Sequence, residues 1–216
     1  MKRKGWLMMV LILGLGAVLP KALALFAQEK TLIDEWNSIQ IPQAPELKQV
    51  TLDPKTTAFL VLDIQKNSCT AQARPRCVAS IPKVKAFLEL CRSKGVFVAH
   101  SLTSTATPQD IVDELSPLPQ EPVVRSGVDK FYKTDLEKIL TDRGIKTVII
   151  AGTAAHGAVL HTATGAALRG LNVVVPVDGM SADVPFAELY TAWHLLNSPG
   201  TRRNSTVTSF SQIRFQ

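Results

Sequence analysis

The chain lacks any uninterrupted apolar run of the roughly 20 residues that a membrane-spanning helix needs. The candidate near its start, residues 6–19, has 14 residues and follows a basic cap at residues 2–4. That pattern is typical of a secretory signal peptide. Small residues predict cleavage after Ala24 or Ala27, so residues 1–27 are expected to be a signal peptide and the protein to be exported, either periplasmic or secreted. An uncleaved membrane anchor is the alternative.

Residues 1–27 also lack acidic side chains, which explains most of the formal charge of +6. Without their four basic residues, the mature chain carries 20 basic and 18 acidic residues. A nearly neutral protein has little of the positive field that nucleic acids attract. The composition therefore argues against a nucleic-acid partner, and no stable membrane insertion is expected after cleavage.

Cysteine is scarce, with three residues. Cys69 and Cys77 flank the segment CTAQARPRC and are expected to pair in an oxidising compartment. Cys91 falls on the apolar side of a predicted helix, which favours a buried thiol, although it is also an alternative partner for either loop cysteine. Arg74 and Arg76 lie in the same loop, where they either add to an anion site or are solvated.

Repeats and low-complexity tracts are absent, and about 190 mature residues suit one domain. Residues 28–55 are expected to form an N-terminal arm, either laid over the surface or loose, before a domain at 56–216. Apolar runs of strand length then alternate with helical patterns, with strands expected at 57–63, 96–101, 121–125, 146–152, 171–178 and, weakly, near 206–210. This alternation predicts an α/β fold, with a doubly wound, mostly parallel, Rossmann-like sheet and helices on both faces.

The helices between these strands have start and stop signals. Ser80, with Pro82 in the first turn, predicts the first helix, and Gly95 ends it. Thr134 and Glu137 form a predicted capping box for the second helix. The third is expected from about residue 157 to residue 169. A final amphipathic helix has its large apolar residues on one stripe: Phe186, Leu189, Tyr190, Trp193 and Leu196.

The expected site lies where the winding of the sheet reverses. In the common doubly wound order the first and fourth strands are neighbours, and ligands bind beyond their carboxyl ends. Those ends carry Asp63, Gln65 and the loop GTAAHGA at 152–158, whose amides at a helix start could hold an anion or oxyanion. Asp63 could instead cap backbone, and His156 is more often a structural hydrogen-bonding residue than a catalytic one at such a position.

The histidines near the predicted site show no metal-ligand spacing with one another. His100 ends one predicted strand and His161 lies on the third helix, and neither is spaced from His156 as zinc ligands are. Neither a metal nor another cofactor is therefore expected.

Three segments together resemble the isochorismatase-like hydrolases, which include nicotinamidases, carbamoyl amidohydrolases and isochorismatases. They are VLDIQ at the first strand, VVRSGVDKFYKTDLEKIL at 123–140, and VIIAGTAAHGAVLHTATGAALRGLNVVVPVD at 148–178. The resemblance covers roughly residues 55 to 212. It implies a small-molecule substrate or ligand, a homo-oligomer, and a cis peptide between Thr153 and Ala154.

Most members of that family use a triad of aspartate, lysine and cysteine, and this chain departs from it twice. Asp63 matches the aspartate. An alignment without gaps places Arg125 where the family has lysine, with Lys130 as the alternative if the loop is shifted. Ala158 stands at the position of the cysteine, and alanine is no nucleophile, so thiol catalysis is excluded there. Thr153 or Thr162 as a replacement nucleophile is a weaker idea.

Isochorismatases proper resemble this chain in having an Ala-His pair in this loop and no cysteine. They hydrolyse a vinyl ether, for which proton donation by the aspartate is the key step. On that analogy Asp63, with a pKa raised by burial, is a general acid or base, and Arg125 or Lys130 orients an anionic substrate. The residues expected to bind the substrate are Gln65, Thr153, Ala154, His156, Gly157 and Ala158. The competing hypothesis is a catalytically inactive member that serves as a ligand-binding or assembly module.

Overall fold

The computed structural model describes residues 30–216 as two units, the first reaching Pro42 and the second comprising Gln43–Gln216. The predicted signal peptide lies outside the described residues. Within residues 30–216, no helix combines the length and the apolar character needed to cross a bilayer.

The first unit contains the short helix α2 (Leu32–Glu35) and the 3-10 turn η2 (Trp36–Ser38). Thr31 opens α2, and its backbone N–H and its hydroxyl both donate to the Asp34 carboxylate, at 2.8 and 2.7 Å. The predicted arm at 28–55 thus includes the boundary between the two units, which follows Pro42. Its later part belongs to the second unit, where residues 50–52 form a strand.

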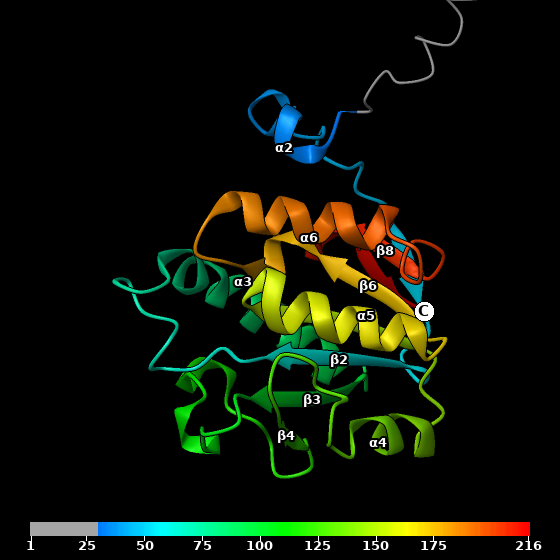
Figure 1. The fold of residues 1–216 in the computed structure, drawn as a ribbon. Helices are drawn as coiled ribbons and strands as arrows, with labels where there is room; N and C mark the ends of the chain where they lie inside the picture. Colours follow the sequence, from blue (N-terminus) through cyan, green and yellow to red (C-terminus); the bar gives the residue numbers. More distant parts are fainter. Residues whose placement is uncertain (1–29) are drawn as a thin grey trace, which may run out of the picture. The chain divides into compact units, whose positions relative to one another are not determined.

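A parallel sheet forms the centre of the second unit (Figure 1). Its strands are β2 (Thr57–Leu62), β3 (Phe97–Leu102), β4 (Val123–Arg125), β5 (Thr147–Thr153), β6 (Asn172–Pro176), β7 (Met180–Ser181) and β8 (Ser205–Thr208). The order is β4-β3-β2-β5-β6-β8, with β7 beside the end of β5, and every pair is parallel. The predicted parallel sheet is confirmed, as are the neighbouring first and fourth predicted strands, β2 and β5.

A second, two-stranded sheet joins the two ends of this unit. β1 (Val50–Leu52) pairs in parallel with β9 (Ile213–Phe215), a strand that the sequence patterns did not predict. The Lys48 N–H donates to the Val207 carbonyl at 3.0 Å, and the Thr208 hydroxyl donates to the Lys48 carbonyl at 2.6 Å. These bonds tie residues 48–52 to the C-terminal strands.

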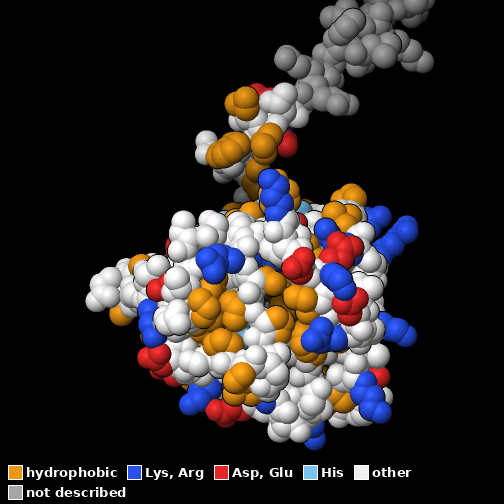
Figure 2. All heavy atoms as spheres, turned by 90° about the horizontal axis from the view of Figure 1, so that it is seen from below, with side chains coloured by type: hydrophobic (Ala, Val, Ile, Leu, Met, Phe, Trp, Pro, Cys, Tyr) orange, Lys and Arg blue, Asp and Glu red, His pale blue; other side chains and the backbone are white. Residues whose placement is uncertain are grey.

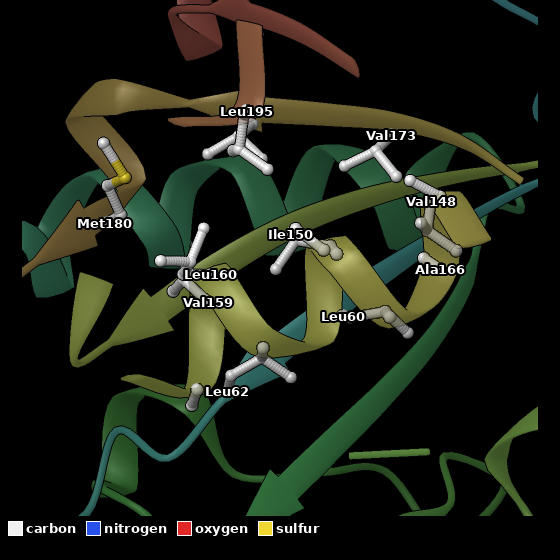
Figure 3. Close-up of a cluster of buried hydrophobic side chains, with 14 of the residues drawn as sticks. Leu60, Leu62, Val148, Ile150, Val159, Leu160, Ala166, Val173, Met180 and Leu195 are labelled. Carbon is white, nitrogen blue, oxygen red and sulfur yellow. The ribbon is translucent and has the colours of Figure 1, made fainter. Parts of the chain in front are cut away.

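Helices cover both faces of the large sheet, as predicted (Figure 1). One face packs against α3 (Pro75–Ser93), and the other against α4 (Leu136–Asp142), α5 (Leu160–Leu168) and α6 (Pro185–Asn197). On the second face Leu60 and Ile150 of the sheet lie against Leu160 and Ala166 of α5 and Leu195 of α6 (Figure 3). Because side chains on both faces are buried, β2 and β5 are continuous apolar runs.

The first large helix begins earlier than predicted. α3 starts at Pro75, which occupies the first-turn position that Pro82 was expected to fill, so Pro82 lies inside the helix. The Ser80 hydroxyl donates to the Cys77 carbonyl at 2.7 Å within the helix and caps nothing. The prediction followed the second of two prolines that both suit a helix start.

The capping box predicted for α4 does not form. Asp135 precedes the helix, and the Thr134 hydroxyl donates to the Lys130 carbonyl while it accepts the Leu136 N–H. Glu137 instead pairs with Arg169, the residue that follows α5, at 2.7 Å. Tertiary partners therefore replace the local contacts that the sequence pattern favours.

The aromatic stripe of α6 does not face the core. Phe186 is 59% exposed, and Tyr190 and Trp193 are 40% exposed. The helix packs through smaller residues, Ala187, Thr191 and Ala192, together with Leu195. Small side chains on this face let the helix pack closely, and the aromatic residues of the stripe stay exposed.

Candidate active site

The site begins where β2 and β5 end side by side. Leu62 is paired with Gly152, which has a φ of +138°, and a Cβ at this glycine would lie 2.1 Å from the Leu62 carbonyl oxygen. Only glycine allows this close approach of the two backbones. Asp63 and Thr153 are the next residues on the two neighbouring strands, so the strand ends bring the acid and the loop together, as the sequence predicted.

Asp63 turns away from the strand with a φ of +54°, a left-handed conformation that costs energy outside glycine and often occurs at functional sites. The residue is 7% exposed. Its carboxylate accepts a hydrogen bond from the Ser101 hydroxyl at 2.7 Å and an ion pair from the Lys130 ammonium at 2.7 Å. Ser101 thus holds Oδ1 of the carboxylate, and Lys130 holds Oδ2.

Lys130, rather than Arg125, is the cation beside Asp63. Its side chain is fully buried, and its Nζ also contacts the main-chain oxygens of Gly127 at 2.6 Å and of Leu102 and Ser126, both at 3.3 Å. Arg125 is exposed at the end of β4, so the preferred alignment without gaps is corrected in favour of the shifted loop.

The loop after β4 explains this shift. The Ser126 hydroxyl lies 2.9 and 2.8 Å from the carbonyl oxygens of Asp129 and Tyr132, which share its one proton, and so closes a tight turn. Lys130 and Phe131 point inward, while Val128 and Tyr132 are exposed. Figure 2 views the molecule from the side of β4 and α4, and apolar side chains gather near the middle of this face with charged ones around them.

Burial raises the pKa of the Asp63 carboxyl, and this effect outweighs Lys130, Ser101 and Arg74, which all lower it. A carboxyl group in this setting holds a proton at a higher pH than an exposed aspartate does. It can therefore serve as a proton donor closer to neutral pH.

The loop after β5 has the expected cis peptide between Thr153 and Ala154. It continues as a π-type turn at Ala155–Val159, so the α-helical part begins at Leu160 and not near Gly157, whose φ and ψ of −110° and −106° are not helical. The Gly157 N–H donates to the Ala154 carbonyl at 2.9 Å.

Ala158 is buried at the position expected for the nucleophile. Its methyl group offers no reactive atom, so a covalent intermediate cannot form at this position. Thr162 was the other expected replacement nucleophile. Its hydroxyl oxygen accepts a hydrogen bond from the main-chain N–H of Lys130 at 3.2 Å. That contact helps to fix the lysine loop.

Two further predicted binding residues have internal partners. The Gln65 amide both donates to the Thr103 hydroxyl, at 3.3 Å, and accepts the Thr103 N–H, at 3.1 Å. Gln65 therefore anchors the loop after β3. The Thr153 hydroxyl donates to the Ser181 carbonyl at 3.1 Å and lies 3.4 Å from the Arg74 guanidinium.

His156 faces away from this cluster. It is exposed and lines a cavity of about 460 Å³ between α5 and α6, together with His161, Phe186, Tyr190 and other side chains. Asp63, Lys130 and Ala158 are not among the residues that line it. No group of three potential metal ligands occurs in the part of the chain that the structure describes.

His100 belongs to a separate buried ion cluster. Its Nε2 lies 3.1 Å from the Glu121 carboxylate, which Arg92 also contacts at 2.8 Å. Burial raises the pKa of Glu121, but the hydrogen bonds from Arg92 and His100 outweigh it and hold the pKa at about 2. This cluster joins α3 to the segment before β4 and takes no part in the site.

The predicted disulfide between Cys69 and Cys77 is confirmed, with Cα atoms 5.3 Å apart. Cys91 is a buried free thiol, also as predicted, and burial raises its pKa. The loop that the disulfide closes carries Arg74, whose Nε donates to the Asp183 carboxylate at 2.7 Å. Arg76 instead pairs with Glu188 of α6.

Sequence reasoning missed Ser101 and gave little weight to Arg74. Ser101 lies near the carboxyl end of β3, the neighbour of β2, and polar residues at such strand ends were the signal available. No sequence signal showed that Arg74 rather than Arg76 reaches the loop after β5.

Comparison with known proteins identifies the family of the chain. Residues 57–201 match the family model of the isochorismatase domain. A secreted isochorismatase effector from Verticillium dahliae is 27% identical over 148 residues, which cover 62% of this chain and 78% of the relative. Streptothricin hydrolase from Streptomyces noursei is 30% identical over 142 residues, which cover 60% of this chain and 56% of that enzyme.

Solved structures show the same fold. An isochorismatase family protein from Desulfovibrio vulgaris has a TM-score of 0.66 at 20% identity, covering 72% of this chain and 95% of the other. The nicotinamidase from Staphylococcus aureus has a TM-score of 0.64 at 18% identity, covering 72% and 99%. With the domain match extending from β2 to the residues before β8, the chain belongs to the isochorismatase family.

Proposed function

We propose that this protein is an exported hydrolase that cleaves a vinyl ether in a small anionic molecule, with Asp63 as the general acid and no covalent intermediate. The observation that carries the proposal is the buried Asp63 carboxyl, held by Lys130 and Ser101, in a chain that has alanine at the expected nucleophile position. The relative from Verticillium dahliae, described as a secreted isochorismatase effector, supports both the reaction class and export.

The reaction needs one proton donor and one water molecule. Protonated Asp63 gives its proton to the terminal vinyl carbon, whose double-bond electrons form the new C–H bond and leave an oxocarbenium ion. Water adds to that cation, and its proton returns to the Asp63 carboxylate. The resulting hemiketal splits into a ketone and an alcohol, so one water is consumed and the enzyme is unchanged.

Each neighbour of Asp63 has a function in this cycle. Burial raises the pKa of the acid and so retains the proton, while Lys130 stabilises the carboxylate that remains after the transfer. The Ser101 hydroxyl orients the other oxygen. The Ala158 methyl group occupies less space than the side chain of a cysteine and cannot form a covalent intermediate.

A minimal probe tests this chemistry. 2-Methoxyacrylate is a vinyl ether that carries a carboxylate, and its hydrolysis yields pyruvate and methanol. We expect the protein to accelerate pyruvate formation and the Asp63→Asn variant to lose about 10²- to 10⁴-fold, the usual contribution of a general acid. Asp142→Asn is the matched control, because this acid is exposed and pairs with Lys138 on α4. In D2O the enzyme-dependent product is expected to carry one deuterium in its methyl group.

The competing function is an inactive ligand-binding or assembly module, which the alanine at position 158 favours. The probe, together with isochorismate as a larger vinyl ether, separates the two. Rates equal to the uncatalysed reaction with both compounds would support the inactive module, whereas accelerated rates that are equal for the unmodified protein and Asp63→Asn would exclude Asp63 as the general acid. A product without deuterium would exclude protonation at carbon.

Export and assembly are tested separately. Expression of the full chain in an exporting host is expected to yield a mature protein that begins at Leu25 or Gln28, as N-terminal sequencing would show. The homo-oligomer implied by the family resemblance stays a prediction, for which light scattering of the mature protein is the measurement.

A further inference from the structure

The buried lysine of the site has no capacity left for an anionic substrate. The Lys130 ammonium has three N–H donors, and its Nζ lies within 3.3 Å of the Asp63 carboxylate and of three main-chain oxygens. An anionic substrate therefore needs a different cation, and Arg125 is exposed at the end of β4.

Arg74 is placed to be that cation. Its guanidinium NH1 lies 3.4 Å from the Thr153 hydroxyl, at the end of β5 where the loop of the site begins. Its charge is also close enough to lower the pKa of Asp63, against the larger effect of burial. The side chain is 26% exposed, so the guanidinium lies at the boundary between the site and solvent.

The guanidinium retains free donors that fit a carboxylate. Of its five N–H groups, one on Nε donates to Asp183 and one on NH1 faces Thr153. The other three, on the two terminal nitrogens, have no partner within residues 30–216, and these nitrogens form the edge that binds carboxylates in two-point contacts. Asp183 occupies a different edge of the fork, and its side chain is 57% exposed, which weakens its competition with a ligand.

The backbone of Arg74 is fixed from both sides. The disulfide between Cys69 and Cys77 closes the segment that contains it, its N–H donates to the Thr70 carbonyl at 2.8 Å, and α3 begins at the next residue, Pro75. A side chain on a pre-organised backbone loses less entropy when it binds. Such a position suits a recognition residue.

We infer that Arg74 is the residue that recognises the carboxylate of the substrate, while Lys130 serves only Asp63. The identity of the reaction rests on the proposed function, but the binding of a carboxylate at Arg74 is measurable without turnover. The ligand class is a small molecule with a carboxylate adjacent to the group that Asp63 protonates.

Binding is measured first, in the Asp63→Asn background so that no turnover occurs. 2-Methoxyacrylate and its neutral methyl ester are titrated by NMR into Asp63→Asn and into the double variant with Arg74→Gln. We expect Arg74→Gln to weaken binding of the carboxylate by about 10- to 100-fold, the range for a hydrogen bond to a charged group, and to leave the ester unchanged. Arg76→Gln is the matched control, because this arginine lies two residues away and pairs with Glu188.

Turnover is then compared in proteins that retain Asp63. The ratio of kcat/KM for the carboxylate to that for the ester is expected to fall in Arg74→Gln and to recover partly in Arg74→Lys, which keeps the charge and loses the fork. Loss of both substrates in equal measure would mean that Arg74 is structural and would overturn the inference.

The two proposals fail in different ways. Carboxylate binding that depends on Arg74, without hydrolysis of any vinyl ether, would retain this inference and remove the proposed function. Hydrolysis that depends on Asp63, with an unchanged preference for the carboxylate in Arg74→Gln, would retain the function and remove the inference.

Discussion

The buried ion pair makes a quantitative prediction about stability. Replacing Lys130 with methionine keeps the apolar stem but removes the ammonium from Asp63 and from three main-chain oxygens. The Asp63 carboxylate then loses Lys130 and keeps its hydrogen bond from the Ser101 hydroxyl. A buried carboxylate that has lost its cation is less stable than the protonated carboxyl group, so Asp63 tends to bind a proton.

The cost follows from the pKa of the unfolded chain. Protonating an aspartate with an ordinary pKa of about 3.9 at pH 7 costs about 4 kcal/mol, at about 1.4 kcal/mol per pH unit. Breaking a buried pair by removing one partner typically costs about 3 to 5 kcal/mol. We therefore expect Lys130→Met to lower the free energy of unfolding by about 3 to 4 kcal/mol, which corresponds to a melting temperature lower by about 6 to 16 °C for a domain of this size.

The loss depends on pH with a defined sign. In the variant the pKa of folded Asp63 is raised further, so the folded state holds a proton that the unfolded state releases above about pH 4. Stability is therefore highest at low pH and falls as pH rises through the pKa of the folded state. The difference between the variant and the unmodified protein should shrink as the pH is lowered from 7 to 5.

Urea unfolding with the disulfide intact, followed by circular dichroism, measures these differences. The double variant Asp63→Asn/Lys130→Met contains no buried charge at this site and should recover much of the loss at pH 7. Lys138→Met is the control, because Lys138 is exposed and its pair with Asp142 contributes little. A loss below about 1 kcal/mol, or one that is equal at pH 5 and pH 7, would refute the reasoning.

Three further outcomes are expected. Removing the disulfide with Cys69→Ala/Cys77→Ala should cost about 2 to 3 kcal/mol of unfolding free energy for a loop of this length, and urea unfolding that matches the unmodified protein would contradict it. Gly152→Ala should abolish soluble expression because its Cβ would meet the backbone of β2, whereas Gly127→Ala, which meets no atom within 4 Å, should express normally. Glu121, with its pKa held at about 2, contributes stability that is present above about pH 4.3 and is lost as pH falls toward 2, so the acid limb of the pH–stability profile should be flatter in Glu121→Gln.

The local patterns of the sequence determined much of the fold. Uninterrupted apolar runs identified β2 and β5 because strands of a covered parallel sheet are buried on both faces. The alternation with helices then implied the strand order in which these two are neighbours. The sequence also predicted three features of the site region: the acid at the end of β2, the absence of a nucleophile at Ala158 and the short disulfide loop. Each of them depends only on which residue occupies a position that the strand and helix pattern already locates.

The cation of the site was decided by tertiary structure. Arg125 and Lys130 lie five residues apart, and the turn closed by Ser126 determines which of them reaches Asp63. The face that α6 buries and the pairing of β1 with β9 likewise depend on contacts between distant segments. The periodicity of a sequence predicts which residues share a face of a helix or strand. The position of a loop side chain depends instead on hydrogen bonds whose partners the linear sequence does not identify. Arg74 is placed by such tertiary contacts too.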